Sequence, residues 1–212
     1  MKKRILVVSA GFIHPSIPAR RGLSAILMAR DRIGPTFTSD IEELALLADD
    51  GFDGIVLYFH RRNISDEALV ALDRFVAGGG GLLALHSASA SFKKKPRYFD
   101  ILGGRFVGHG KIEPYTVSRA TGASPFFSVI EPFTVTDELY IHQYRDDVTI
   151  QYATETKAGS EPVVWTRGHG KGRVCYVSLG HVASVLRNDA VKGIISDALS
   201  FILKIGQGRT DG

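Results

Sequence analysis

Short apolar runs alternate with amphipathic stretches through the first 86 residues of the chain. Residues 5–8, 54–59 and 82–85 are almost wholly apolar, which is typical of strands buried on both faces. Ser16 and Ser65 each precede a stretch with apolar residues at helical spacing, as helix-capping residues do. This alternation predicts a parallel sheet whose strands are joined by right-handed helical crossovers, with helices on both faces.

Weaker signals complete this half of the chain and lead into a less regular region. Residues 36–38 fit a short second strand, and Ser39 with Glu42 forms a capping-box pattern for a helix whose apolar face includes Ala48. From residue 92 the periodicity loosens, and we expect an ordered, glycine-rich loop over residues 103–110.

The rest of the chain predicts further strands and a closing helix. The strand candidates are residues 115–117, 133–135, 148–153, 162–166 and 173–178. A glycine-rich turn makes the last two a β-hairpin, and Asn188 or Asp189 caps the helix that follows. The predicted class is α/β: one three-layer α/β/α domain over residues 1–206, flavodoxin-like, with a mostly parallel sheet, a C-terminal β-hairpin and a flexible tail at 207–212.

Composition narrows the class of protein. The 212 residues are 44% hydrophobic and 23% charged, and the formal net charge is only +4, as in soluble globular domains. The basic run at residues 93–97 has no interleaved aromatic residues, so we interpret it as a solvated loop that could attract an anionic ligand, and we expect no nucleic-acid partner.

Cys175 is the sole cysteine and lies in a strand pattern, which predicts a buried, inert thiol. Because no apolar run reaches signal or membrane-span length, we expect a cytoplasmic protein with no membrane contact.

Residues 78–89 have the pattern of a strand-to-helix elbow. Four glycines end a helix, four apolar residues form a short strand, and His86 follows where that strand ends. Small residues come next, so a helix can start close against the sheet. An elbow of this kind displays one side chain at the carboxyl edge of a parallel sheet. An imidazole in that place favours a proton-transfer or metal site over acyl transfer.

Histidines recur at the same edge of the predicted sheet. Of the seven in the chain, His14, His60, His86 and His181 each fall just after a predicted strand. We place His109 and His142 in insertions that cover this edge, and His169 in the hairpin turn as a solvent-exposed bystander.

Two chemistries are open to these histidines. Neutral imidazole is a metal ligand and also a general base near pH 7, and His14, His86 and His181, or a set including His109, would suit Zn²⁺ with an open position. No local ligand-spacing motif supports a metal, so acid–base and purely structural roles remain alternatives. The carboxylates of Asp137 and Glu138 fit a general acid or base, or groups that orient a histidine, or a capped turn.

Several segments in this order resemble the ThuA-like (trehalose utilisation) family over most of the chain. They are residues 12–18, 79–86, 104–109, 132–133 with 137–140, and 162–165 running on to 172–173 and 178–181. The resemblance implies a class I glutamine amidotransferase-like fold and a link to the catabolism of trehalose and related disaccharides through keto-sugars. It also implies that glutaminase chemistry is absent, because the elbow carries His86 where those enzymes place a cysteine. The chain departs from the family pattern at Ser87, where an alanine is usual, and at Gly110, where a proline often follows the histidine.

The resemblance implies a set of site residues. The positions that match the family's polar motifs are His14, Ser16, His86, His109, Asp137, Glu138, Tyr140 and His181.

From these positions we predict a site that acts on a sugar or keto-sugar by isomerisation, elimination or hydrolysis. His86, His181 and Glu138 are the expected catalytic groups, and the expected substrate-binding residues are His14, Ser16, His109, Asp137 and Tyr140. The candidate ligands for Zn, Mn or Ni are His14, His86, His109 and His181. A sugar dehydrogenase is a partner implied by the resemblance, and an oligomer is left open. The alternative is a sugar-binding or scaffolding module without turnover.

Overall fold

The computed structural model describes residues 2–10, 15–46, 51–61 and 63–206. The elements, with 3₁₀ helices labelled η, are β1 (Lys3–Ala10), α1 (Ile17–Met28), β2 (Ile33–Thr38), η1 (Ile41–Leu46), β3 (Gly54–Phe59), α2 (Asp66–Ala77), β4 (Gly81–Leu85), η2 (His86–Ala90), α3 (Pro96–Leu102), β5 (Gly104–Arg119), β6 (Phe133–Tyr144), β7 (Thr149–Thr156), β8 (Gly159–His169), β9 (Gly172–Val177), η3 (Val185–Arg187) and α4 (Asp189–Ile202).

The strands of the described residues form one nine-stranded sheet in the order β2-β1-β3-β4-β9-β8-β7-β5-β6. The pairs from β2 to β9 are parallel, and the pairs from β9 to β6 are antiparallel. The prediction of a mostly parallel sheet is therefore wrong, because the sheet is mixed. Strands β7, β8 and β9 follow one another through tight turns, and strands joined in that way must run in opposite directions. The predicted β8–β9 hairpin is confirmed.

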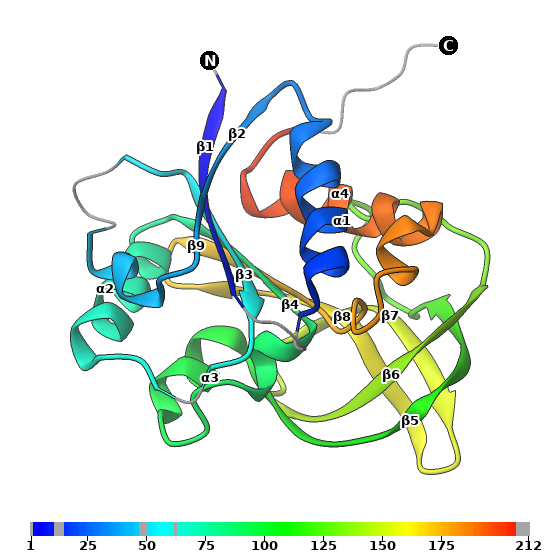
Figure 1. Ribbon diagram of the computed structural model, residues 1–212. Helices are drawn as coiled ribbons and strands as arrows, with labels where there is room; N and C mark the ends of the chain where they lie inside the picture. Colours follow the sequence, from blue (N-terminus) through cyan, green and yellow to red (C-terminus); the bar gives the residue numbers. More distant parts are fainter. Residues whose placement is uncertain (1, 11–14, 47–50, 62, 207–212) are drawn as a thin grey trace.

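Helices cover both faces of the parallel part of the sheet. Alternate residues of β1 belong to different cores: Ile5 and Val7 pack with α1 and α4, whereas Leu6 and Val8 pack with η1, α2 and α3. Figure 1 shows α1 and α4 together on one side of the strands and α2 and α3 on the other. A strand with two buried faces must be apolar at every position, which explains the continuous apolar runs.

Three predicted helix starts are confirmed and one is wrong. The side chains of Ser16, Ser65 and Asn188 cap α1, α2 and α4. The capping box of Ser39 and Glu42 does not form. The helix there is the six-residue η1, in which Asp40 Oδ1 accepts from the Glu42 backbone N–H while the Glu42 carboxylate accepts from the backbone N–H of Ser65. Glu42 thus supports the start of α2, and Ala48 lies outside the described residues.

Residues 104–110 are part of a strand, not of a loop as predicted for residues 103–110, and Gly103 is the C-cap of α3. Residues 104–110 begin β5, which pairs with β6 in a long ribbon at the edge of the sheet, curved in Figure 1. The register shifts between Phe106 and Gly108 and again between His109 and Ile112. Bulges of this kind bend a strand and redirect its side chains. The glycines that indicated a loop therefore belong to an irregular, curved strand.

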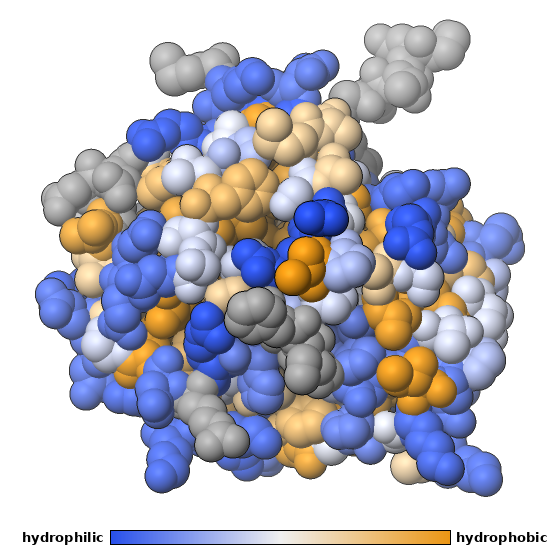
Figure 2. Space-filling model, viewed as in Figure 1, coloured by the Kyte–Doolittle hydropathy of each residue, from blue (hydrophilic) through white to orange (hydrophobic). Residues whose placement is uncertain are grey.

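No helix in the described part of the chain is both long enough and apolar enough to cross a bilayer. On the face shown in Figure 2, hydrophilic residues predominate and apolar residues are interspersed among them.

Gly172 marks a close contact between two backbone segments. A Cβ atom at this position would overlap the carbonyl oxygens of Val76 and Gly80, at the points where α2 ends and β4 begins. We expect Gly172→Ala to lower the free energy of unfolding by about 2 kcal/mol or more, as overpacking against fixed backbone does. Gly168→Ala is the matched control, because a Cβ there meets nothing within 4 Å. Urea denaturation of the two variants beside the wild type measures the difference, and equal midpoints would contradict the expectation.

Candidate active site

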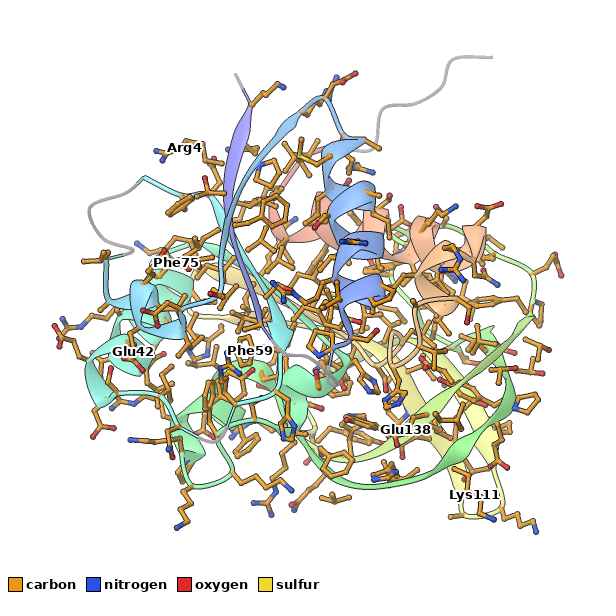
Figure 3. All side chains as sticks on the ribbon, viewed as in Figure 1. Arg4, Glu42, Phe59, Phe75, Lys111 and Glu138 are labelled. Carbon is orange, nitrogen blue, oxygen red and sulfur yellow. The ribbon has the colours of Figure 1, made fainter. Side chains whose placement is uncertain are left out.

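Four segments bring polar side chains together at the carboxyl edge of the parallel strands. His86 comes from the end of β4, His109 from β5, Glu138 from β6, and His181 from the segment after β9. Figure 3 labels Glu138, which lies between the β5–β6 ribbon and the rest of the domain. The polar residues at this edge of the sheet therefore come from the β5–β6 ribbon of the antiparallel half as well as from the parallel half.

His86 occupies a strained elbow. Its φ of 40° lies in the left-handed region that non-glycine residues seldom adopt, at a typical cost of about 1–3 kcal/mol. The helix that follows is the short 3₁₀ helix η2, all five residues of which are buried. The elbow turns the imidazole inward, under the ribbon, so that only 1% of it is exposed.

Glu138 is shared by three imidazoles. Its Oε1 lies 3.0 Å from Nδ1 of His109, and its Oε2 lies 3.2 Å from Nδ1 of His181 and 3.9 Å from Nε2 of His86. The His86 Nε2 and His181 Nδ1 atoms are themselves 3.3 Å apart. The carboxylate is largely buried, at 12% exposure, so its interactions with these rings are weakly screened by solvent.

The backbone fixes the tautomer of His86. Its Nδ1 lies 2.7 Å from the carbonyl oxygen of Ser178. Because a carbonyl oxygen only accepts, Nδ1 carries a proton and donates it. In the neutral ring the lone pair is then on Nε2, the nitrogen that faces Glu138 and His181. His86 can therefore accept a proton or bind a metal ion at Nε2.

The ligand-atom set fits a divalent transition metal. The side-chain donor atoms of His86, Glu138 and His181 all lie within 4.8 Å of one another. Two nitrogens bound at about 2.0–2.1 Å to a tetrahedral Zn²⁺ stand roughly 3.3–3.4 Å apart, and those of His86 and His181 are 3.3 Å apart. A carbonyl hydrogen bond on the far nitrogen of the ring, as Ser178 provides, is the usual partner of a metal-binding histidine. Two imidazoles and a carboxylate leave a coordination position open, as catalytic zinc sites do.

Aromatic rings form one wall of the site. The Tyr140 ring lies 4.0 Å from that of His86 and 4.4 Å from that of Phe106, measured between centroids. Phe106 is stacked with His109, whose side chain is 48% exposed. Burial, together with the nearby charge of Glu138, raises the pKa of Tyr140, so its hydroxyl stays protonated. The wall thus runs from a buried tyrosine to an accessible histidine.

Comparison with known proteins establishes the family of the chain. The family model described as ThuA, trehalose utilisation, matches residues 4–202. The chain belongs to the ThuA family. No curated protein matches it.

Solved structures share the fold of this ThuA-family chain at low sequence identity. A putative ThuA-like protein from Parabacteroides merdae has a TM-score of 0.84 at 16% identity, over 100% of this chain and 94% of that one. Another from Bacteroides uniformis has a TM-score of 0.77 at 16% identity, over 95% and 91%. A β-galactosidase from Rahnella sp. R3 has a TM-score of 0.66 at 12% identity, and the match covers 98% of this chain but only 32% of the enzyme. The fold is that of class I glutamine amidotransferase-like proteins.

Asp137 lies beneath the site of the ThuA chain and does not line it. It is fully buried, and its carboxylate accepts hydrogen bonds from the backbone N–H groups of Gly180 at 2.7 Å, Val182 at 3.1 Å and His181 at 3.3 Å. Burial raises the pKa of Asp137, against the opposing effect of these donors. Gly180 has a φ of 123°, a conformation that glycine adopts readily, and its carbonyl accepts from Tyr58 at 2.5 Å. Asp137 therefore holds the segment that carries His181.

The remaining candidates lie away from the cluster or outside the described residues. His14 is outside them. The Ser16 hydroxyl caps α1 and accepts from the backbone N–H of Ala19 at 3.4 Å. His60 is exposed at the end of β3, and His142 is buried on β6, not in an insertion. His109 likewise lies on a strand, β5.

Two further predictions concern residues outside the site. His169 was expected to be a solvent-exposed bystander, but its Nε2 lies 2.6 Å from Asp73, so it links the β8–β9 hairpin to α2. Cys175 is fully buried, and burial raises the pKa of its thiol, which agrees with the predicted inert cysteine.

Sequence reasoning missed four residues around the cluster. The Tyr58 hydroxyl donates to the Gly180 carbonyl, in the segment of His181, and the Ser178 carbonyl accepts from the ring of His86. Glu161 and Tyr176 are buried and bonded to His142. Glu161 was the only one with a signal, because it directly precedes the apolar residues 162–166, and it lies with them in the buried strand β8, where a charged group needs a partner.

Proposed function

We propose that this site is the active site of an enzyme of carbohydrate catabolism, which acts at or beside the carbonyl group of a sugar related to trehalose. The observation that carries the proposal is the position of Glu138, a largely buried carboxylate in contact with His86, His109 and His181. A base and proton donors within about 4 Å of each other are the minimum needed to move a proton between neighbouring atoms of a substrate. Membership of a family described by trehalose utilisation supports a sugar as that substrate.

The chemistry follows from the acidity of a C–H bond next to a carbonyl. Glu138 takes the proton from that carbon, and the C–H electron pair becomes a C=C bond. The carbonyl π electrons move to oxygen, which receives a proton from an N–H group of the His86–His181 pair. The resulting enediol returns to a carbonyl at either carbon, or expels a neighbouring leaving group, so isomerisation and elimination share this first step.

A metal ion would fit the same residues. His86, Glu138 and His181 would hold it, and the ion would supply Lewis-acid polarisation of the substrate's carbonyl oxygen. Proton movement would then pass to His109, which reaches the other oxygen of Glu138 and is the most exposed member of the group.

The aromatic wall suits a sugar ring. Phe106, which packs against the buried ring of Tyr140, presents an apolar surface beside the polar cluster. Sugars bury their C–H faces against such rings while their hydroxyl groups bond to neighbouring polar side chains. A keto-sugar must be supplied by oxidation of a hydroxyl group, so a sugar dehydrogenase is the class of enzyme we propose upstream.

Metal analysis tests the centre directly. Tag-free wild type is compared with the His86→Ala, His181→Ala double variant, and His169→Ala serves as a histidine control outside the site. Near-stoichiometric Zn, Mn or Ni in the wild type and the control, but absent from the double variant, is expected for a metal site. A metal-free wild type would contradict a metal-dependent mechanism. Turnover of keto-sugars would then test acid–base catalysis alone.

The fold comparison favours a second candidate, a sugar-binding or scaffolding module without turnover. The same fold forms about a third of chains named β-galactosidases, so it also exists as one part of larger sugar-processing proteins. Such a module would bind sugar in calorimetry but show no turnover, and Glu138→Gln would change only its affinity. An enzyme would show a bell-shaped pH dependence of kcat/KM.

A further inference from the structure

A buried polar cluster lies directly beneath His86. It consists of Ser89, His142, Glu161 and Tyr176, which are 1%, 6%, 8% and 0% exposed. The rings of Trp165 and Tyr176 lie 4.1 Å apart, and Trp165 also contacts His142 at 5.1 Å, so apolar surface seals the cluster on that side. Buried polar groups on this scale are retained when each has a partner.

The cluster is a chain of hydrogen bonds that ends on His86. Glu161 Oε1 lies 3.0 Å from Nδ1 of His142 and also accepts the backbone N–H of that residue at 3.1 Å. His142 Nε2 lies 3.1 Å from the Tyr176 hydroxyl and 3.3 Å from that of Ser89. These two hydroxyl groups are 2.8 Å apart, and they reach the carbonyl oxygen of His86 at 2.9 Å and 3.2 Å respectively.

A count of protons shows that each acceptor of the chain has a donor when His142 is neutral. Burial lowers the pKa of His142, against the opposing effect of Glu161. In the neutral ring Nδ1 donates to the carboxylate, so Nε2 must accept. Two acceptors, Nε2 of His142 and the carbonyl of His86, then face two hydroxyl groups with one proton each. One proton can go to each acceptor, and the 2.8 Å contact between the two hydroxyl oxygens then carries no proton of its own.

The end point of the chain is the strained peptide. The orientation of the His86 carbonyl fixes ψ of that residue, and its φ of 40° is unfavourable for a side chain with a Cβ atom. Such a conformation persists only where the surroundings hold it. The imidazole projects from this residue toward Glu138 and His181, so its direction depends on the backbone conformation in which the His86 carbonyl is held.

We propose that Glu161, His142, Tyr176 and Ser89 are positioning residues, which hold the His86 peptide in the conformation that aims its Nε2 at Glu138 and His181. None of the four contacts the proposed ligand, and each acts through the His86 carbonyl. The inference deepens the proposed function, because it matters for catalysis only if His86 belongs to the reacting group.

Tyrosine-to-phenylalanine variants test the proposal with a close control. Tyr176→Phe removes the hydroxyl that bonds to the His86 carbonyl, and Ser89→Ala with Tyr176→Phe removes both. Tyr98→Phe is the control, because Tyr98 is equally buried and its hydroxyl donates at 3.0 Å to Ala88, a carbonyl of the same 3₁₀ helix. Thermal unfolding should show similar losses of stability for the two tyrosine variants.

Two readouts separate positioning from stability. The first is Zn²⁺ titration: we expect Tyr176→Phe to weaken binding about tenfold and the double variant up to about 100-fold, as loss of outer partners does, with Tyr98→Phe unchanged. The second is the imidazole ¹H–¹⁵N spectrum, in which the His86 signals, assigned with His86→Ala, should shift in Tyr176→Phe and not in Tyr98→Phe.

The second readout tests the positioning role independently of the proposed function. If the wild type binds no Zn²⁺, the metal-dependent form of the proposed function fails. The His86 ring signals alone then decide whether the cluster positions that residue. Equal changes of these signals in Tyr176→Phe and Tyr98→Phe would overturn the positioning role and leave the cluster as a structural network.

Discussion

Glu138→Gln is expected to remove most of the activity of the site while leaving the fold intact. Glutamine keeps the size of the side chain but has no charge and no basic oxygen, so it can neither take a proton nor pair with the imidazoles of His109 and His181. Loss of a general base lowers turnover by about 10²–10⁴-fold. If the centre holds Zn²⁺, the affinity for the ion should fall by about 100-fold or more, since a direct ligand matters at least as much as its outer partners.

Stability should respond differently from activity in this variant. The carboxylate is 12% exposed and sits in the desolvated cluster, so removing its charge offsets the lost pairing. We expect the free energy of unfolding to stay within about 1 kcal/mol of the wild type, or to rise, as substitutions at active sites often do.

Glu113→Gln is the matched control for Glu138→Gln. Glu113 lies on the same ribbon but is exposed, so its substitution should leave metal content, turnover and stability unchanged. The comparison uses metal analysis, keto-sugar turnover and urea denaturation on the three proteins. Full metal content and turnover in Glu138→Gln would contradict the central role of this carboxylate.

The parallel half of the fold could be predicted because burial on both faces leaves a clear pattern. Residues 54–59 and 82–85 have no polar position, and β3 and β4 are fully buried there. The ribbon of β5 and β6 could not be predicted in the same way. Much of it is exposed, so its residues need not alternate between apolar and polar, and the bulges near Phe106 and His109 break the period of two.

Strand direction was also hidden. A buried strand has the same apolar pattern whether its neighbours run parallel or antiparallel. The glycine-rich turn predicted the antiparallel pair of residues 162–166 and 173–178, but the pattern of residues 148–153 alone could not show that their strand also runs antiparallel to its neighbours. The recurrence of histidines after strands did predict the edge of the sheet at which the site lies. Two of these histidines, His86 and His181, are in contact there.

The different contacts of the neighbouring carboxylates Asp137 and Glu138 could not be predicted from the sequence. Asp137, as a substrate-binding residue, and Glu138, as a catalytic residue, are both predicted to line the site, but successive residues of a strand point to opposite sides. Glu138 contacts the histidine side chains, whereas Asp137 contacts the backbone of residues 180–182. The partners of both come from distant parts of the chain, and the sequence contains no local signal for such contacts.

Asp137→Ala is therefore expected to damage the fold and the site together. The substitution leaves three backbone N–H groups without their acceptor, that of Gly180 buried and those of His181 and Val182 partly buried. Hydrogen bonds to a charged acceptor contribute about 1.5–3 kcal/mol each but are not additive, and relief of the buried charge offsets part of the loss. We expect the free energy of unfolding to fall by about 3 kcal/mol or more.

Local measurements distinguish this effect from general destabilisation. Amide hydrogen exchange should accelerate first at residues 180–182, and Zn²⁺ affinity should fall because His181 is no longer held 3.3 Å from His86. Asp146→Ala, at an exposed position between β6 and β7, should change stability by less than about 0.5 kcal/mol. If exchange at residues 180–182 stayed as slow as in the wild type, the Asp137 carboxylate would not be what holds His181 in the site. The placement of that imidazole would then depend on the Tyr58 hydroxyl, which bonds to the Gly180 carbonyl from the opposite side of the same peptide segment.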